Sequence, residues 1–302
     1  MIAPGFGKCA VTPIRPTPGR KTATPTTHRR HSKTTTPSGT VGSSVKRTRE
    51  ADIMASNHGK NAAIIIIGNE ILSGKVTDKN SGYLTGQLRA LGVNVQRIVV
   101  VPDDVPAIAQ EIAFCKKQFD LIFTSGGVGP THDDVTMEGI AAGVGRPLVH
   151  HPLLDQILKK IYAGGLNAAL MKLADVPDGL ELLYSDHLRI PVLHFGEIYI
   201  FPGIPELLVR KFEAIKERFR DAPFHLKKIF LVKEEDEIAE HLNITLRQFP
   251  HLLLGSYPIL NHPDYKVILT LESKELSYVE GAAKMLLSLL PDDSVLKIEQ
   301  GA

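Results

Sequence analysis

The sequence predicts a three-layer α/β domain with a mostly parallel sheet, followed by a small α+β domain. Short β-branched segments alternate with segments of helical periodicity between residues 62 and 219. Residues 62–67 are apolar throughout, which is typical of a strand covered on both faces. After Pro223 the alternation gives way to paired strands. We therefore expect domains at residues 61–222 and 223–302, preceded by a tail at residues 1–60.

The first domain is expected to place helices on both faces of its sheet, because strands and helices follow one another in turn. Strands are predicted at residues 62–67, 93–101 and 121–124, with a β-hairpin formed by residues 192–195 and 198–201. Helices are predicted at residues 78–91, 106–117, 135–144, 152–163 and 205–219. Gly92 would end the first helix, and Pro205 would begin the last.

The second domain has a different order of expected elements. Strands are predicted at residues 228–232, 252–257 and 266–271, and helices at residues 235–249 and 276–290. This βαββα order indicates a small α+β domain of ferredoxin-like type.

The tail carries much of the positive charge of the chain. Of 35 Lys and Arg residues, ten fall within residues 1–49, which contain no Asp or Glu. The remaining 25 face 33 acidic residues, a net charge of −8, so binding of nucleic acid through a basic surface is not expected. Residues 1–60 lack apolar periodicity and are predicted to be disordered. Their Arg, Ser and Thr content also fits a transit peptide, although the prolines do not, and a solvated tail is the alternative.

The apolar runs and the cysteines indicate in which cellular compartment the chain is expected. No apolar run approaches the roughly 20 residues that cross a bilayer, so no membrane partner is expected. Cys9 and Cys115 form no disulfide framework or zinc spacing, which fits a reducing compartment. We therefore expect the mitochondrial matrix or the cytosol.

The strongest local motif is Ser125-Gly-Gly-Val-Gly-Pro-Thr-His-Asp-Asp134, which follows a buried strand and precedes a helix. Ligands of open α/β sheets collect at this edge. Gly126, Gly127, Gly129 and Thr131 would contact the ligand, and the backbone N–H groups and helix N-terminus suit phosphate. The simpler interpretation is a tight turn with Asp134 as a helix cap.

Two acids in this loop oppose binding of an anion. Like charges about 4 Å apart repel by about 4 kcal/mol at an effective dielectric of 20. One solution is a divalent cation, Mg²⁺ or Co²⁺, held by Glu70, Asp133 and Asp134 together with phosphate oxygens. The other is that an acid accepts hydrogen bonds from the N–H groups of a ligand ring. The first predicts phosphoryl chemistry, and the second predicts recognition of a pterin-like or purine-like ring.

Two further loops follow strands. Residues 68–80 contain Glu70 and Asp78, but not a Walker A motif, because five residues separate Gly68 from Gly74 and Val76 replaces the required Ser or Thr. Asp78 also suits a helix cap.

Pro202, Gly203 and Pro205 form a turn into the last helix of the domain and would bind another part of the ligand. Three lysines could offset the charge of a phosphate, although each also suits a solvated position: Lys75, Lys79 and Lys172.

Together the three loops resemble the MoaB/Mog molybdopterin-binding domain, which also occurs in the CinA family. The resemblance covers residues 62–220, and Asp78, Asp134 and residues 202–205 match the acidic positions and proline–glycine turn of the family. Val128 stands where molybdenum-cofactor members often have Thr, and Pro130 where Phe is common. The missing Thr hydroxyl removes one hydrogen-bonding group for molybdopterin. Together with the FAD-synthase-like segments described next, it moves the expected ligand toward a flavin dinucleotide.

Residues 171–177, 254–258 and 265–273 are similar to the N-terminal module of animal-type bifunctional FAD synthases. That resemblance implies metal-dependent hydrolysis of FAD to FMN and AMP. It assigns adenylyl transfer to a further domain, which would begin where this chain ends.

Three hypotheses follow from the motifs and the resemblance. The first is a metal-dependent diphosphatase acting on FAD or a related nucleotide, with Asp78 and Asp134 as catalytic residues. The second is a pterin-binding module without hydrolysis, and the third is a non-catalytic partner of a separate synthase domain. We expect a homo-oligomer with a nucleotide or pterin as its ligand.

Overall fold

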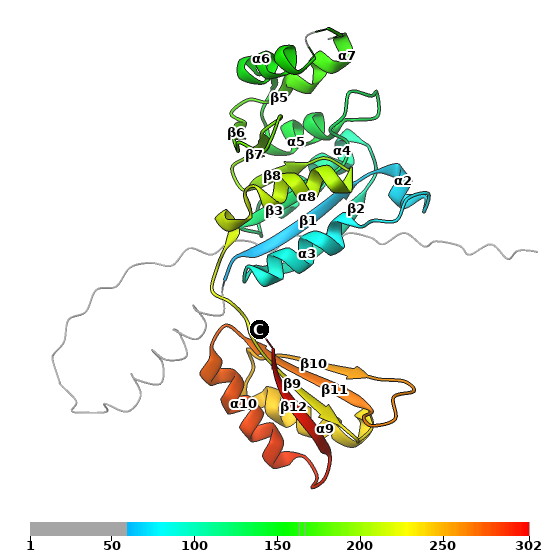
Figure 1. The fold of residues 1–302 in the computed structure, drawn as a ribbon, viewed down its shortest axis with the longest axis vertical. Helices are drawn as coiled ribbons and strands as arrows, with labels where there is room; N and C mark the ends of the chain where they lie inside the picture. Colours follow the sequence, from blue (N-terminus) through cyan, green and yellow to red (C-terminus); the bar gives the residue numbers. More distant parts are fainter. Residues whose placement is uncertain (1–58, 163, 166, 302) are drawn as a thin grey trace, which may run out of the picture. The chain divides into compact units, whose positions relative to one another are not determined.

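The computed structural model describes residues 59–162, 164–165 and 167–301. The tail predicted at residues 1–60, with its possible targeting role, lies outside this range except for its last two residues. The elements described below are labelled in Figure 1.

Six strands form the main sheet of the first domain: β1 (Asn61–Ile67), β2 (Asn94–Val101), β3 (Leu121–Ser125), β6 (Glu181–Leu183), β7 (Val192–Phe195) and β8 (Ile198–Phe201). They lie in the order β2-β1-β3-β8-β7-β6. β2, β1, β3 and β8 are parallel to one another, whereas β7 and β6 add antiparallel pairings. The predicted mostly parallel sheet and the β-hairpin are therefore confirmed.

Four helices cover this sheet: α3 (Asn80–Ala90), α4 (Val105–Cys115), α5 (Thr136–Val144) and α8 (Pro205–Glu213). Neighbouring residues of β1 point to opposite faces, as in any strand. Ile64 packs in one core with Leu84 of α3, and Ile65 packs in a second core with Ile108 of α4. Both faces of the sheet are covered, which explains why β1 has no polar residue after Asn61.

A small subdomain formed by residues 148–177 extends the domain at one end (Figure 1). It contains β4 (Leu148–His150), α6 (Pro152–Ile161), α7 (Ala168–Met171), the 3₁₀ helix η1 (Lys172–Ala174) and β5 (Asp175–Pro177). β4 and β5 form an antiparallel pair. Leu154 and Leu158 of α6 are buried in the same core as Ile65. Only α6 among these elements was predicted from the sequence.

Four antiparallel strands make the sheet of the second domain: β9 (His225–Leu231), β10 (Leu253–Pro258), β11 (Val267–Ser273) and β12 (Val295–Gly301). Their order is β10-β11-β9-β12, with α9 (Glu235–Gln248) after β9 and α10 (Leu276–Leu289) after β11. This order and the βαββαβ sequence of elements confirm the ferredoxin-like prediction. β12 was missed because it is a largely exposed edge strand, with no apolar run to mark it.

Two helix predictions need correction. The helix expected from residue 78 begins at Asn80, and a four-residue helix, α2 (Asn69–Leu72), precedes it. The helix expected over residues 205–219 is interrupted: α8 ends at Glu213, and the 3₁₀ helix η2 (Lys216–Phe219) follows. Phe212 and Phe219, on either side of the break, both pack against Phe123.

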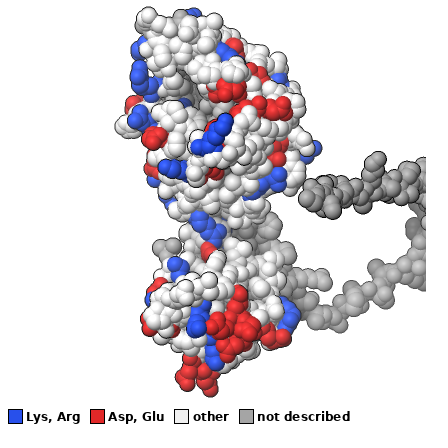
Figure 2. All heavy atoms as spheres, turned by 90° about the vertical axis from the view of Figure 1, so that its right-hand side faces the viewer, with Lys and Arg blue, Asp and Glu red and all other residues white. Residues whose placement is uncertain are grey.

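In the described part of the chain, no helix has both the length and the apolarity needed to cross a membrane. On the face drawn in Figure 2, Lys and Arg side chains are interspersed with Asp and Glu.

Candidate functional site

Three loops of the first domain meet at one edge of the sheet. β1, β3 and β8 are parallel neighbours, so their carboxyl ends lie side by side. The loops that leave them are residues 68–79, 126–135 and 202–204. These are the three segments that the sequence motifs singled out, and ligands of open α/β sheets bind at such an edge.

A buried hydrogen-bond network joins the three loops. The Asn80 side-chain amide donates to the Ser125 hydroxyl (2.9 Å) and to the Gly203 carbonyl (2.7 Å). The Ser125 hydroxyl in turn donates to the Pro202 carbonyl (3.2 Å). Asn80 and Ser125 are both buried, so the bond between them is shielded from water, while the bonds to Gly203 and Pro202 are partly buried. Both residues lie within the segments that the sequence motifs singled out, but neither was assigned a role there. The one available signal was a polar residue at a buried position of α3.

The glycine loop turns sharply as it leaves β3. Gly126 has φ 110° and Gly127 has φ 60°, in the region that favours glycine. A Cβ at Gly126 would lie 2.0 Å from the carbonyl oxygen of Ile67, so only glycine fits between the two strand ends. Thr136, at the start of α5, fixes the turn by donating its hydroxyl to the Gly126 carbonyl (2.8 Å).

The two acids of this loop have different surroundings. The Asp134 carboxylate accepts a hydrogen bond from the Thr131 backbone N–H (2.8 Å) and lines a cavity. Asp133 is exposed and accepts from the Thr131 hydroxyl (2.6 Å), and this bond lowers the pKa of its carboxyl. Neither Thr131 nor Asp133 lines either of the two cavities described below. The Thr131 hydroxyl also contacts the Asp134 carboxylate, so one threonine bridges the two acids although only Asp134 reaches the cavity.

The larger cavity has a volume of about 210 Å³ and lies between the glycine loop, the subdomain of residues 148–177 and α8. Most of its lining is aliphatic: Val128, Met137, Leu148, Leu154, Leu158, Leu173, Ile190, Leu193, Ile200 and Leu207. Gly127, Gly129 and Pro202 complete the wall beside the loops. Since sites that enclose a drug-sized ligand are typically about 300–1,000 Å³, this cavity can enclose one ring system of a larger ligand.

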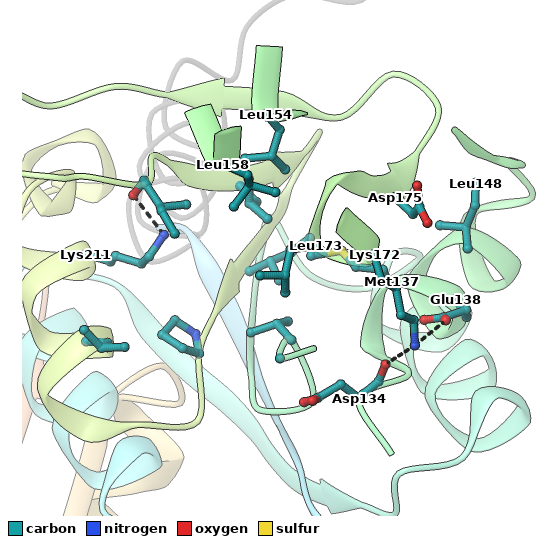
Figure 3. Close-up of a pocket in the computed structure, with 18 residues that line it drawn as sticks. Asp134, Met137, Glu138, Leu148, Leu154, Leu158, Lys172, Leu173, Asp175 and Lys211 are labelled. Carbon is teal, nitrogen blue, oxygen red and sulfur yellow. Dashed lines mark hydrogen bonds and ion pairs between the residues drawn. The ribbon is translucent and has the colours of Figure 1, made fainter. Parts of the chain in front are cut away.

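Charged groups line this cavity at two places (Figure 3). Lys172 donates to the Asp134 carbonyl (3.0 Å) and pairs with Glu138 (3.1 Å). Lys211 lies apart from them and donates to the carbonyls of Ile190 (3.1 Å) and Pro191 (2.6 Å). Burial lowers the pKa of Lys211 to about 8. The sequence analysis named Lys172 but missed Lys211, because a lysine in an amphipathic helix normally faces solvent.

The smaller cavity, of about 70 Å³, lies at the same edge of the sheet, beside the ends of β1 and β3 and the proline–glycine loop. Its lining includes Glu70, Asp78 and Lys79, together with Asn80, Ser125, Gly203 and Pro205. The proline–glycine loop borders both cavities, since Pro202 lines the larger one and Gly203 lines the smaller one. Lys75 is exposed and lines neither cavity.

Asp78 is engaged by the backbone that follows it. One of its carboxylate oxygens accepts from the N–H groups of Asn80 (2.9 Å) and Ser81 (3.0 Å), and the other accepts from the Ser81 hydroxyl. The helix-capping role that the sequence offered as an alternative is therefore present. It leaves free lone pairs on the carboxylate, so capping does not exclude contact with a ligand.

The carboxylates do not form a cage for a metal ion. Within the described residues, no group of three or more His, Cys, Asp and Glu side chains could hold a metal. The predicted trio of Glu70, Asp133 and Asp134 is divided between the smaller cavity, an exposed loop position and the larger cavity. Glu70 and Asp78 share one cavity, however, and one or two carboxylates with substrate phosphates are the donors that Mg²⁺ typically uses.

The sequence of each domain matches a known protein family. Residues 63–221 match the family described as a probable molybdopterin binding domain. The chain belongs to this family. Residues 223–299 match a second family, described as the middle domain of FAD synthase. The resemblance inferred from the motifs is thus confirmed.

Two curated proteins are similar to this chain over about three quarters of its length. A protein of Archaeoglobus fulgidus is 35% identical over 229 residues, which are 76% of this chain and 97% of that protein. A probable FAD synthase of Caenorhabditis elegans is 30% identical and matches 76% of this chain, but the match covers 50% of that protein. The chain therefore spans about half the length of that relative.

One solved structure is similar in sequence as well as fold. The CinA protein of Thermoplasma acidophilum, described as having unknown function, is 31% identical, with a TM-score of 0.50. The similarity covers 53% of this chain and 98% of that one.

Proposed function

We propose that the first domain binds a flavin-type dinucleotide at the sheet edge and hydrolyses its diphosphate with the help of a divalent cation. The observation that carries this proposal is a pair of cavities that both border the proline–glycine loop. The larger one is apolar and could hold a ring, and the smaller one is lined by the carboxylates of Glu70 and Asp78 among apolar residues. A dinucleotide has both parts, joined by the diphosphate that the loops would contact.

The comparisons support flavin or molybdopterin metabolism as the setting. Curated relatives from two Caenorhabditis species are named probable FAD synthases, and the second domain matches the middle domain of that enzyme. The family of the first domain takes its name from molybdopterin. Both ligands combine a heteroaromatic ring with phosphate, which fits an apolar cavity beside a glycine loop.

In the proposed reaction, one water molecule is added across the P–O–P bridge. The water oxygen bonds to one phosphorus, the bridging oxygen leaves with the other, and FAD yields FMN and AMP. Glu70 and Asp78 would hold Mg²⁺ or Co²⁺ together with phosphate oxygens, and the cation, when bound, offsets phosphate charge. Asp134, which lines the larger cavity, would orient the water and accept its proton.

A second candidate is binding of a pterin or flavin without hydrolysis. It is favoured by the hydrogen bonds that Asp78 already accepts from Asn80 and Ser81, because those bonds explain the carboxylate without catalysis.

The test is incubation of the chain with FAD, with and without Mg²⁺ or Co²⁺, while FMN and AMP are measured by chromatography. We expect release that depends on the cation, and a loss of at least about 100-fold in Asp78→Asn and in Asp134→Asn. Asp186→Asn is the control, since Asp186 is exposed and lines neither cavity. Release that is independent of metal, or that is unchanged in Asp134→Asn, contradicts the proposal. Binding of FAD with no turnover supports the second candidate.

A further inference from the structure

Lys211 is an unusual cation for an apolar cavity. Its ammonium group donates only to the backbone carbonyls of Ile190 and Pro191. None of the ion pairs among the described residues includes it. Lysines that are removed from water are normally paired with a carboxylate, because an unpaired cation is costly there. Lys172, at the same cavity, is paired in this way with Glu138.

The charged groups of the cavity lie at two opposite ends of it. In Figure 3, Lys211 lies on one side, while Lys172, Asp134, Glu138 and Asp175 lie on the other. The leucines of α6 and Leu173 lie between the two sides. A ligand that fills this space needs an apolar body with a hydrogen-bond acceptor at the Lys211 end.

The ammonium group has one donor available for such an acceptor. Lysine carries three N–H donors, and the carbonyls of Ile190 and Pro191 take two of them. The third is free to bind a ligand, because Lys211 lines the cavity wall. The lowered pKa of Lys211 agrees with an ammonium group that is removed from water and has no carboxylate beside it.

We propose that Lys211 binds a carbonyl oxygen on the edge of a heteroaromatic ring held in the larger cavity. This inference rests on the proposed function, because it places the ring in the larger cavity and leaves the diphosphate to the glycine loop and the smaller cavity. The dione edge of a flavin and the lactam of a pterin share the chemistry that Lys211 would recognise. A phosphate group is the other possible partner of a cation, and the test separates the two.

The experiment is calorimetric titration of the full chain with riboflavin, with a pterin and with AMP. Riboflavin has the ring without phosphate, and AMP has the phosphate without the flavin. We expect Lys211→Met to weaken binding of riboflavin by about 10- to 100-fold, the loss expected when a hydrogen bond to a charged group is removed. Binding of AMP should not change. Lys211→Arg, which keeps the charge, should bind riboflavin more tightly than Lys211→Met.

Lys160→Met is the matched control, because Lys160 is exposed on α6 and lines neither cavity. Should Lys211→Met fail to fold, Leu207→Trp replaces it. Leu207 is 40% exposed and lines the cavity, so an indole there would exclude the ring without disturbing the buried core. We expect Leu207→Trp to abolish riboflavin binding and to leave AMP binding intact.

The inference is overturned if the unaltered chain does not bind riboflavin or the pterin, or if Lys211→Met binds them as the unaltered chain does. Loss of AMP binding in Lys211→Met, or competition of inorganic phosphate with riboflavin, would assign Lys211 to phosphate and overturn it as well. Ring binding that depends on Lys211 in a protein that never cleaves FAD would refute the proposed hydrolysis alone.

Discussion

Asn80 shows what a single side chain contributes to the site. Its amide group bonds to one residue 45 positions away and to another 123 positions away. No local pattern contains such a contact, because the partner is defined only after β1, β3 and β8 pair. Asp78 and Asp134, by contrast, could be selected from the sequence, since acids in a glycine-rich loop conflict with a phosphate ligand and therefore call for an explanation.

We expect Asn80→Leu to lower the free energy of unfolding by about 1–3 kcal/mol, because the change removes the buried hydrogen bond to Ser125 and the partly buried one to the Gly203 carbonyl. Asn80→Asp should be at least as damaging, since a carboxylate cannot donate to that carbonyl. Chemical denaturation measures both. Gln87→Leu, at a partly exposed position of the same helix, should change stability by less than about 0.5 kcal/mol. An Asn80→Asp protein of unchanged stability would refute the role of this network.

At the scale of elements, the long helices and strands were predictable and the short ones were not. β1 and α4 have enough residues for an apolar run or a helical period to stand out. β4 and β5 have three residues each, too few for any period. The wall that these strands provide for the larger cavity, and with it the cavity itself, was therefore invisible in the sequence.

His150 connects three elements of this subdomain. Its ring Nδ1–H donates to the Asp175 carboxylate of β5 (2.7 Å), and its Nε2 lies 3.2 Å from the Asp155 carboxylate of α6. These carboxylates, Asp175 foremost, raise the pKa of His150. Lys159 is the other charged group nearby and pairs with Asp155. Since the folded pKa lies above the unfolded value of about 6.5, the stabilisation is present below that pH and is lost as the pH rises through the folded pKa.

His150→Gln should therefore lower the free energy of unfolding, and the loss should be larger at pH 5.5 than at pH 8.5. The difference between the two pH values is expected to be at most about 1 kcal/mol, because the pairs are partly exposed. Chemical denaturation at both pH values measures it, with His187→Gln as an exposed control. An equal loss at both values would exclude the charged pairs as the cause.

For the whole molecule, the structure contains separate hydrophobic cores. Two lie on the faces of the six-stranded sheet, and a third is formed by residues between Ile229 and Val295. The change in element order after Pro223 was enough to predict this division, because the apolar pattern of each strand and helix shows which of its faces must be buried. Patterning could not report the strand order β10-β11-β9-β12, which depends on contacts between distant segments.

A cavity made in the third core should affect that domain alone. Leu269 of β11 is fully buried, and Leu269→Ala is expected to cost about 2–5 kcal/mol. Hydrogen exchange followed by mass spectrometry should show faster exchange in β9, β10 and β11, with exchange in β1 and β3 unchanged. Leu253→Ala, at a position that is 45% exposed, is the control. Faster exchange throughout the chain would mean that the domains unfold as one unit.

The partners of Asn80 become available at different times during synthesis. The chain leaves the ribosome from its N-terminus, so Asn80 and Ser125 are available long before Gly203. Until β8 has joined β3, the proline–glycine loop is missing, and both cavities lack part of their walls. A nascent chain released before residue 203 would lack part of both cavities, so we expect it not to bind the proposed ligand. Occupancy of the site would thus report that the parallel sheet has been assembled through β8.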